Sequence, residues 1–175
     1  MLWFVVWLPV NVIYECCHTL TRVVVTYWPQ WGRSQMWSNF SFSFFCLLEC
    51  KEYKTLSSRD RSMSVPRGNV LKCDQKDLTK GWYRFSGEAG SAMPTKCVPS
   101  NYCGAHAPGW MQGAHPTKAE GAVTRKVCYH WTNNCCQWSN NIRVRNCGDF
   151  YVYELDKTPV CSLRYCGNAP SGKIF

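Results

Sequence analysis

Short runs in which apolar and polar side chains alternate recur between residues 50 and 166, and this alternation is typical of β-strands that bury one face. Residues 81–87 read Gly-Trp-Tyr-Arg-Phe-Ser-Gly, a strand bracketed by glycines. Residues 142–145 place two aliphatic side chains on one face and two arginines on the other. The chain therefore predicts a sheet of short strands.

The C-terminal third continues the same pattern. A turn is expected at Cys147-Gly148-Asp149, and residues 150–155 follow it as another strand, so that residues 142–155 predict a hairpin. A final short strand is expected over residues 161–166, where Cys161 and Cys166 would face opposite sides.

One helix is expected, from Lys118 to Trp131, because Thr117 and Glu120 form a capping-box pattern, although Gly121 weakens it. Residues 104–116 are rich in Gly, Pro, Ala and His and are expected to form a loop. The predicted fold class is a small β-rich, disulfide-stapled domain of short antiparallel strands and hairpins, with at most one or two short helices.

The first 49 residues differ from the rest. Residues 2–14 are apolar, but Pro9 and Asn11 interrupt them, which makes the stretch too short and broken for a membrane span. It is either a weak signal peptide or a segment foreign to the native protein. The second interpretation is motivated by residues 39–48, which use almost only amino acids with pyrimidine-rich codons, as a translated intron end would.

The predicted organisation is an uncertain hydrophobic leader or gene-model artefact over 1–49, a cysteine-rich domain over 50–166 and a tail over 167–175. If the leader is foreign, Cys16, Cys17 and Cys46 lie outside the native disulfide set, and the Asn39 glycosylation sequon has no meaning.

Ten of the 13 cysteines lie in the 50–166 segment, and an even count at this density is typical of an oxidised, secreted scaffold. They are Cys50, Cys73, Cys97, Cys103, Cys128, Cys135, Cys136, Cys147, Cys161 and Cys166. Adjacent Cys135 and Cys136 should not bridge each other, because vicinal bridges are strained. On an extended chain they point to opposite faces and tie two different segments.

Zinc is the rival interpretation of these cysteines. Cysteines and histidines between residues 97 and 136 could supply ligands, but this half has no Cys-x2-Cys pair. Disulfides are therefore favoured, and neither a metal site nor a cofactor is expected.

The net charge of +9 lies entirely after Glu49, because the acidic and basic residues before it balance. The basic residues are scattered, which favours an ordinary solvated surface and no nucleic-acid partner. The alternative is a cationic domain that binds acidic glycans. It would use Arg59, Arg61, Arg67, Arg125 and Lys126.

No catalytic arrangement emerges from the sequence. The phosphate-loop, nucleophile-elbow and His-Glu-x-x-His patterns are all missing from it. Cys128 and His130 are two residues apart, which on a helix would not face each other, and Cys128 is wanted for a bridge. We expect no enzyme, and a small secreted hydrolase is the least favoured alternative.

The candidate binding residues lie mainly in the Gly/Pro-rich segment and just after it. Trp110 could be an exposed anchor for a partner or could fold back to fill a small core. Trp82, Trp131 and Trp138 are expected to be core residues. The candidates are His106, Trp110, His115, Arg125 and Lys126.

Many of these motifs recur in a fixed order. In chain order they are Cys73-Asp74, Gly81-Trp82-Tyr83-Arg84-Phe85, Gly87-x-x-Gly90, Met93-Pro94, Cys97-Val98-Pro99, Cys103, Ala107-Pro108-x-Trp110, Gly113-x-His115-Pro116, Glu120-Gly121, Arg125-Lys126-x-Cys128-x-His130-Trp131, Cys135-Cys136-x-Trp138, Val144-x-x-Cys147, Tyr151-Val152-Tyr153-x-Leu155 and Cys161-x-Leu163-x-Tyr165-Cys166. Together they resemble the eight-to-ten-cysteine domain of uromodulin and the pancreatic secretory granule membrane glycoprotein, over residues 50–166.

The resemblance implies a secreted or cell-surface, non-enzymatic interaction module in a longer mosaic glycoprotein with neighbouring extracellular domains. The partner would be an unidentified extracellular protein or glycan bound through loops, with no stable membrane span. The resemblance also implies the pairs Cys50–Cys147, Cys73–Cys161, Cys97–Cys135, Cys103–Cys166 and Cys128–Cys136.

The sequence departs from the resemblance in one respect. Uromodulin-like domains can carry Asn-linked glycans that microbial lectins bind, but the matching stretches here, residues 112–114 and 154–156, have no sequon. A glycan-decoy role through those positions is therefore not expected.

Overall fold

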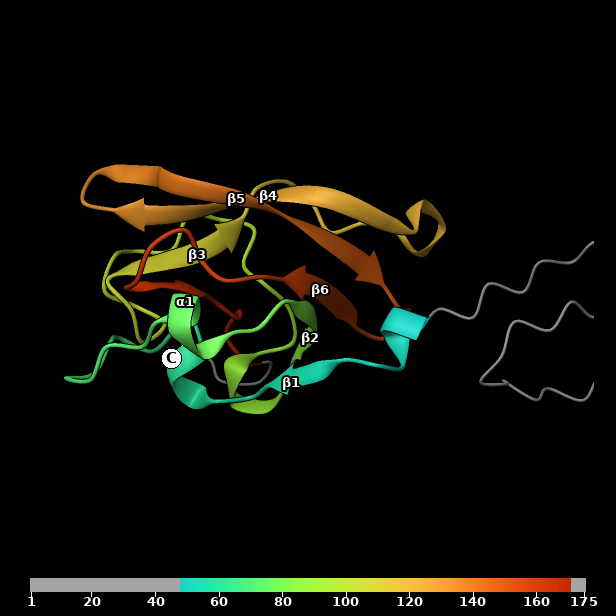
Figure 1. Cartoon of the computed structure of the whole chain (residues 1–175), viewed down its shortest axis with the longest axis horizontal. Coiled ribbons are helices and arrows are strands. Elements are labelled where there is room, and N and C mark those ends of the chain that lie inside the picture. The colour runs from blue at the N-terminus through green and yellow to red at the C-terminus, as the bar shows by residue number, and fades with distance from the viewer. Residues whose placement is uncertain (1–47, 171–175) are drawn as a thin grey trace, which may run out of the picture. The chain divides into compact units, whose positions relative to one another are not determined.

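Seven strands form a single sheet in the computed structural model, which describes residues 48–170. They are β1 (Lys54–Leu56), β2 (Gly81–Phe85), β3 (Ala107–Met111), β4 (Ala122–Trp131), β5 (Asn134–Asn146), β6 (Tyr151–Leu155) and β7 (Leu163–Tyr165). Their order across the sheet is β1-β2-β6-β5-β4-β3-β7 (Figure 1). The helical part is one α-helical turn, α1 (Asp74–Asp77), and short 3-10 turns at Leu48–Cys50, Arg59–Arg61, Gly87–Ala89 and Lys118–Glu120. The β-rich fold class is confirmed.

The two longest strands, β4 and β5, form an antiparallel hairpin that spans one side of the molecule (Figure 1). The β5 strand then turns into β6, with Arg143 opposite Glu154. The expected hairpin over 142–155 is present, but its first strand begins at Asn134. Ile142 and Val144 are buried while Arg143 is exposed, as the alternation predicts.

The predicted helix over 118–131 is wrong beyond its first turn. The capping contact forms, since the backbone N–H of Thr117 donates to the Glu120 carboxylate at 2.6 Å. The helix then stops, because Gly121 adopts a φ of 68°, and the next residue begins β4. Pairing with β5 along nearly the whole strand outweighs a local capping signal.

The predicted loop over 104–116 contains a strand, β3, which lies between β4 and β7. Gly109 makes this packing possible, because a Cβ there would lie 2.7 Å from the Tyr129 ring. Pro108 precedes the first β4 partner, Gly109, so its missing N–H leaves the β3–β4 register intact. The composition suggests a loop because Gly and Pro usually punctuate strands.

Tyrosines form most of the bulk of the core. Tyr83, Tyr129, Tyr153 and Tyr165 are nearly or fully buried together with Phe85. Their hydroxyls have partners: for example, Tyr129 donates to the Asn140 side chain at 2.7 Å.

The expectation that Trp82, Trp131 and Trp138 belong to the core is only partly met. All three are half-buried, and Trp131 and Trp138 pack against the edge of the core.

The sheet curls until its two ends approach each other, so that β1 lies below the β4–β5 hairpin (Figure 1). Past β1, Ser62 forms a parallel bridge with Gly167, just past β7. The backbone N–H of Met63 donates to Gly167 at 2.8 Å, and that of Gly167 donates to Arg61 at 2.9 Å. Gly167 and Asn168, which fall in the predicted tail, are thus bonded to the sheet-closing segment and its neighbours.

Candidate functional site

Five disulfides join the ten cysteines that follow Glu49. The pairs are Cys50–Cys147, Cys73–Cys161, Cys97–Cys135, Cys103–Cys166 and Cys128–Cys136, the same pairs that the resemblance implies. Cys135 and Cys136 lie on β5 and bridge in different directions, one to the segment before β3 and one to β4. The leader and its three cysteines lie outside the described residues, except for Leu48 and Glu49.

The sulfur chemistry of the described segment is committed to cross-linking. Cys97, His130 and Cys135 place possible ligand atoms within 4.8 Å of one another, but the two sulfurs are bonded to each other and offer no thiolate. Cys128 is likewise bonded to Cys136 and cannot act as a nucleophile.

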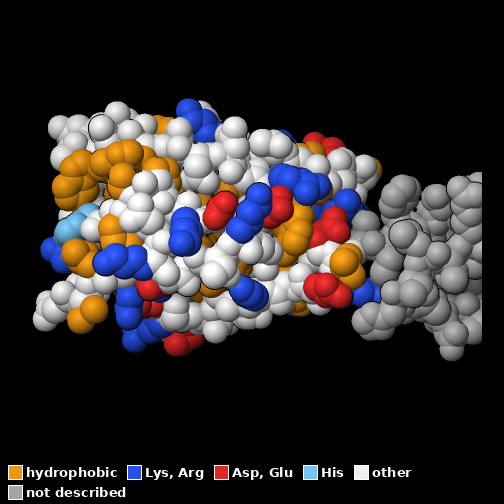
Figure 2. Space-filling model, viewed as in Figure 1, with side chains coloured by type: hydrophobic (Ala, Val, Ile, Leu, Met, Phe, Trp, Pro, Cys, Tyr) orange, Lys and Arg blue, Asp and Glu red, His pale blue; other side chains and the backbone are white. Residues whose placement is uncertain are grey.

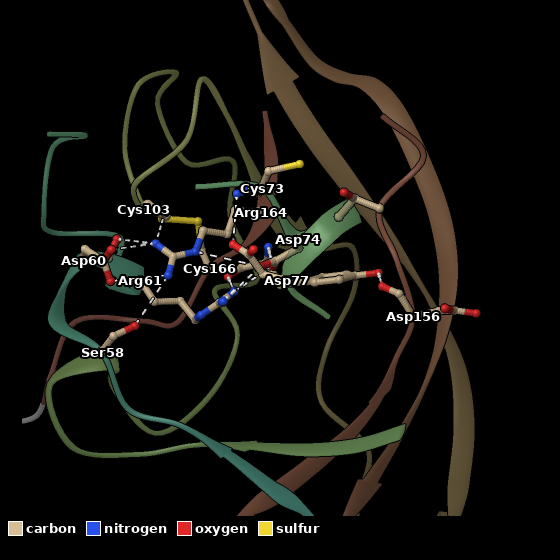
Figure 3. Close-up of polar contacts among 12 residues, drawn as sticks. Ser58, Asp60, Arg61, Cys73, Asp74, Asp77, Cys103, Asp156, Arg164 and Cys166 are labelled. Atoms are coloured by element: carbon tan, nitrogen blue, oxygen red, sulfur yellow. Dashed lines mark hydrogen bonds and ion pairs between the residues drawn. A yellow bond between two sulfur atoms is a disulfide. The ribbon is translucent and has the colours of Figure 1, made fainter. Parts of the chain in front are cut away.

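A buried ionic cluster, Arg61, Asp74, Arg164 and Asp60, lies where the sheet closes (Figure 3). The guanidinium of Arg61 donates to both oxygens of Asp74, at 2.7 and 2.9 Å. Asp74 is fully buried and also accepts the backbone N–H of Tyr165 at 2.9 Å. This cluster joins α1, β7 and the turn at Arg59–Arg61, three segments far apart in the sequence.

Arg164 occupies the other half of the cluster. It donates to the backbone oxygen of Cys103 at 3.1 Å and pairs with the Asp60 carboxylate at 3.1 Å. Burial alone would raise the pKa of Asp60, but the hydrogen bond and charge of Arg164 hold it below its ordinary value.

The proposed acidic-glycan surface must therefore be corrected. Arg61 is only 4% exposed and is engaged by Asp74, so it is not available to a polyanion. Among the other members, Arg67 donates to Asn101 at 2.9 Å and Arg125 to Ala114 at 3.0 Å, while Arg59 and Lys126 are exposed. These residues form no continuous basic patch in the interactions of the described segment.

The candidate binding residues separate into three places. His115 and Arg125 form the first, because Arg125 donates to the carbonyl beside His115. Trp110 lies at the second, half-buried against the small cluster of Val98, Cys103 and Cys166.

The Trp110 indole N–H donates to the Cys135 carbonyl at 2.8 Å, so its ring is partly a packing element. Lys126 is exposed on β4. The sequence could not show this division, because it depends on the register of β3 against β4.

His106 belongs to the third place, a hollow of about 220 Å³ that it shares with Trp131 and Trp138. The centroids of the His106 and Trp131 rings are 5.5 Å apart. Hydrophobic side chains and a histidine gather at the end of the molecule where the β4–β5 turn lies (left in Figure 2).

His115 predicts a pH dependence of stability. Its ring bonds to the Tyr153 hydroxyl at 2.8 Å, and burial and the charge of Arg125 lower its pKa from 6.5 to about 4. The unfolded chain therefore binds this proton first as the pH falls below 6.5, and the folded state loses stability between pH 6.5 and 4. His115→Gln should flatten this part of the profile, as measured by urea midpoints at about pH 7 and about pH 5. Equal losses in both chains over that interval would contradict it.

Comparison with known proteins identifies the domain. The family model of the uromodulin-like cysteine-rich domain matches residues 83–167. Pancreatic secretory granule membrane major glycoprotein GP2 of Canis lupus familiaris is 48% identical over 121 residues, 69% of this chain and 23% of that protein. Uromodulin of Rattus norvegicus is 43% identical over 127 residues, 72% of this chain and 19% of that protein. GP2 of Mus musculus is 39% identical over 128 residues, 71% of this chain and 24% of that protein.

The chain therefore spans about a quarter or less of each of these relatives. The expected secreted or cell-surface location agrees with them, and the name of one places it in the secretory granule membrane. Within residues 48–170, the helices are all too short to cross a membrane. The disulfide-bonded sheet, the order of its cysteines and these matches lead to one conclusion: the cysteine-rich segment of this chain belongs to the uromodulin-like domain family.

Proposed function

We propose that this chain is a rigid, non-enzymatic interaction module of a longer extracellular or cell-surface glycoprotein, and that it binds an extracellular protein or glycan. The single observation that carries the proposal is the commitment of all ten described cysteines to five disulfides around a closed sheet. Such cross-linking suits a domain that must keep a surface in one shape outside the cell.

The proposed organisation is a module over residues 50–166 between a leader over 1–49 and a tail over 167–175. Neighbouring domains of the same parent glycoprotein are part of this proposal, since the relatives are several times longer than the matched segment.

The binding surface includes Trp110 in this proposal. The test is binding of the full, oxidised chain to extracellular proteins and glycans on an array, with Trp110→Ala beside it. The substitution should weaken the strongest interaction about tenfold or more, because partly buried tryptophans often anchor interfaces. Trp82→Ala, which changes a half-buried tryptophan on β2, is the matched control.

Two results would count against the proposal. One is an oxidised chain that retains no extracellular ligand; the other is a hydrolytic activity that survives buffer controls. If Trp110→Ala abolishes cooperative unfolding, Trp110 is a core residue and its place in the binding surface is wrong. Elution from heparin at or below physiological salt would separately argue against the acidic-glycan alternative.

A further inference from the structure

The hollow beside His106 combines aromatic faces with polar atoms that have no partner. Trp131 comes from the end of β4 and Trp138 from β5, and both pack against the edge of the core. Ser162 and Leu163, just before and at the start of β7, complete the wall with Ala107. Residues from four separated parts of the sequence therefore meet around one space.

The polar atoms of this lining are available to a ligand. Within residues 48–170, the indole N–H groups of Trp131 and Trp138, the His106 ring nitrogens and the Ser162 hydroxyl make no hydrogen bond to protein. None of them is among the buried unpaired atoms either, so each can be reached from solvent. An apolar wall that presents several free donors favours a ligand with both an apolar face and hydroxyl groups.

The backbone at Ser162 supports a built site. Ser162 adopts a φ of 68°, a left-handed conformation that is unfavourable for a residue with a side chain. It is held there by the backbone N–H of Ala107, which donates to the Ser162 carbonyl at 3.1 Å. The hydroxyl at the rim of the hollow is thus placed by a strained turn tied to β3.

Size and charge narrow the chemical class of the ligand. The described lining includes no Asp, Glu, Lys or Arg, so a charged ligand would find no counter-ion. The volume of about 220 Å³ is below the usual range of about 300–1,000 Å³ for drug-sized ligands, which leaves room for one small ring.

We infer that this hollow binds one pyranose ring of a neutral glycan. The C–H face of the sugar would stack on the indole of Trp131 or Trp138, because the negative face of an aromatic ring attracts the slightly positive C–H groups. The sugar hydroxyls would pair with the free N–H groups and with Ser162. The inference rests on the proposed function as an interaction module and specifies one class of ligand for it.

The test uses the full, oxidised, ¹⁵N-labelled chain and four probes: the methyl glycosides of glucose, galactose, mannose and N-acetylglucosamine. At least one of them should shift the indole resonances of Trp131 and Trp138 in a saturable way, with a Kd on the order of 1 mM for so small a ligand. Ser162→Gly should weaken binding about tenfold, the loss expected for one good hydrogen bond, and should still fold because glycine accepts the left-handed backbone.

The control variants separate binding from folding. Trp131→Ala should also weaken the interaction about tenfold or more, whereas Trp82→Ala should leave it unchanged. The inference is overturned if no glycoside shifts the two indoles, if the shifts fall on Trp82 or Trp110 instead, or if self-association or a proline-rich peptide shifts them while glycosides do not.

These outcomes also distinguish the inference from the broader proposal. A chain that binds an extracellular protein on the array but no glycoside loses only the sugar site. A chain that binds neither loses both.

Discussion

Asp74→Ala should destabilise the oxidised chain by about 3–5 kcal/mol, the usual cost of removing one partner of a buried ion pair. Asp74 is fully buried and accepts both arms of the Arg61 guanidinium and the backbone N–H of Tyr165. Its loss would leave two nearly buried cations, Arg61 and Arg164, without the carboxylate between them. Urea unfolding with the disulfides intact measures the change.

An exposed carboxylate provides the matched control. Asp149 lies in the turn between β5 and β6, and Asp149→Ala should change the free energy of unfolding by less than about 0.5 kcal/mol. A double variant that carries Asp74→Ala and Arg61→Ala should lose less than the sum of the two single losses, because the partners are coupled. Additive losses would show that the pair contributes no specific interaction.

Removal of the Cys103–Cys166 disulfide is expected to have a similarly large effect. This bridge spans a sequence separation of 63 and lies in the fully buried cluster with Val98. In the chain-entropy account, a loop of that length is worth about 4 kcal/mol, and the replacement of both cysteines by Ala should cost about that much. Peptide mapping of the parent chain should first identify the bridged peptides.

The Cys128–Cys136 bridge is the comparison, because it spans a sequence separation of only 8 between neighbouring strands. Its removal in the same way should cost about 2.5 kcal/mol on the same account. A larger loss from the short bridge than from the long one would show that packing, and not loop length, governs the contribution of these disulfides.

The hairpin over 142–155 could be predicted from the sequence because its signal is local. Alternation of two residues determines which face is buried, and Ile142 and Val144 follow it. The fold class could likewise be predicted, since ten cysteines in so short a segment favour a cross-linked scaffold.

The errors share a physical cause, which is that long-range pairing overrides local preference. The Thr117–Glu120 capping contact is real, but β5 holds the ten residues of β4 as a strand. Gly109 suggests a loop although it permits close strand packing against Tyr129. Such outcomes depend on partners far away in the sequence.

The two most informative sites could not be found from the sequence for a related reason. An arginine is usually solvated, so the sequence alone favours a surface position for Arg61, and only the fold brings Asp74 to it. The hollow brings His106 and Ser162 together through the parallel pairing of β3 with β7, and no spacing along the chain announces it.

The way the sheet closes also bears on how this domain tolerates crowding. A long exposed strand edge is a template for aggregation with another chain. Here one edge strand, β1, has only three residues and begins with a lysine, while all three residues of the other, β7, are buried. A domain built in this way can be packed at high concentration with little tendency to stack edge to edge into fibrils.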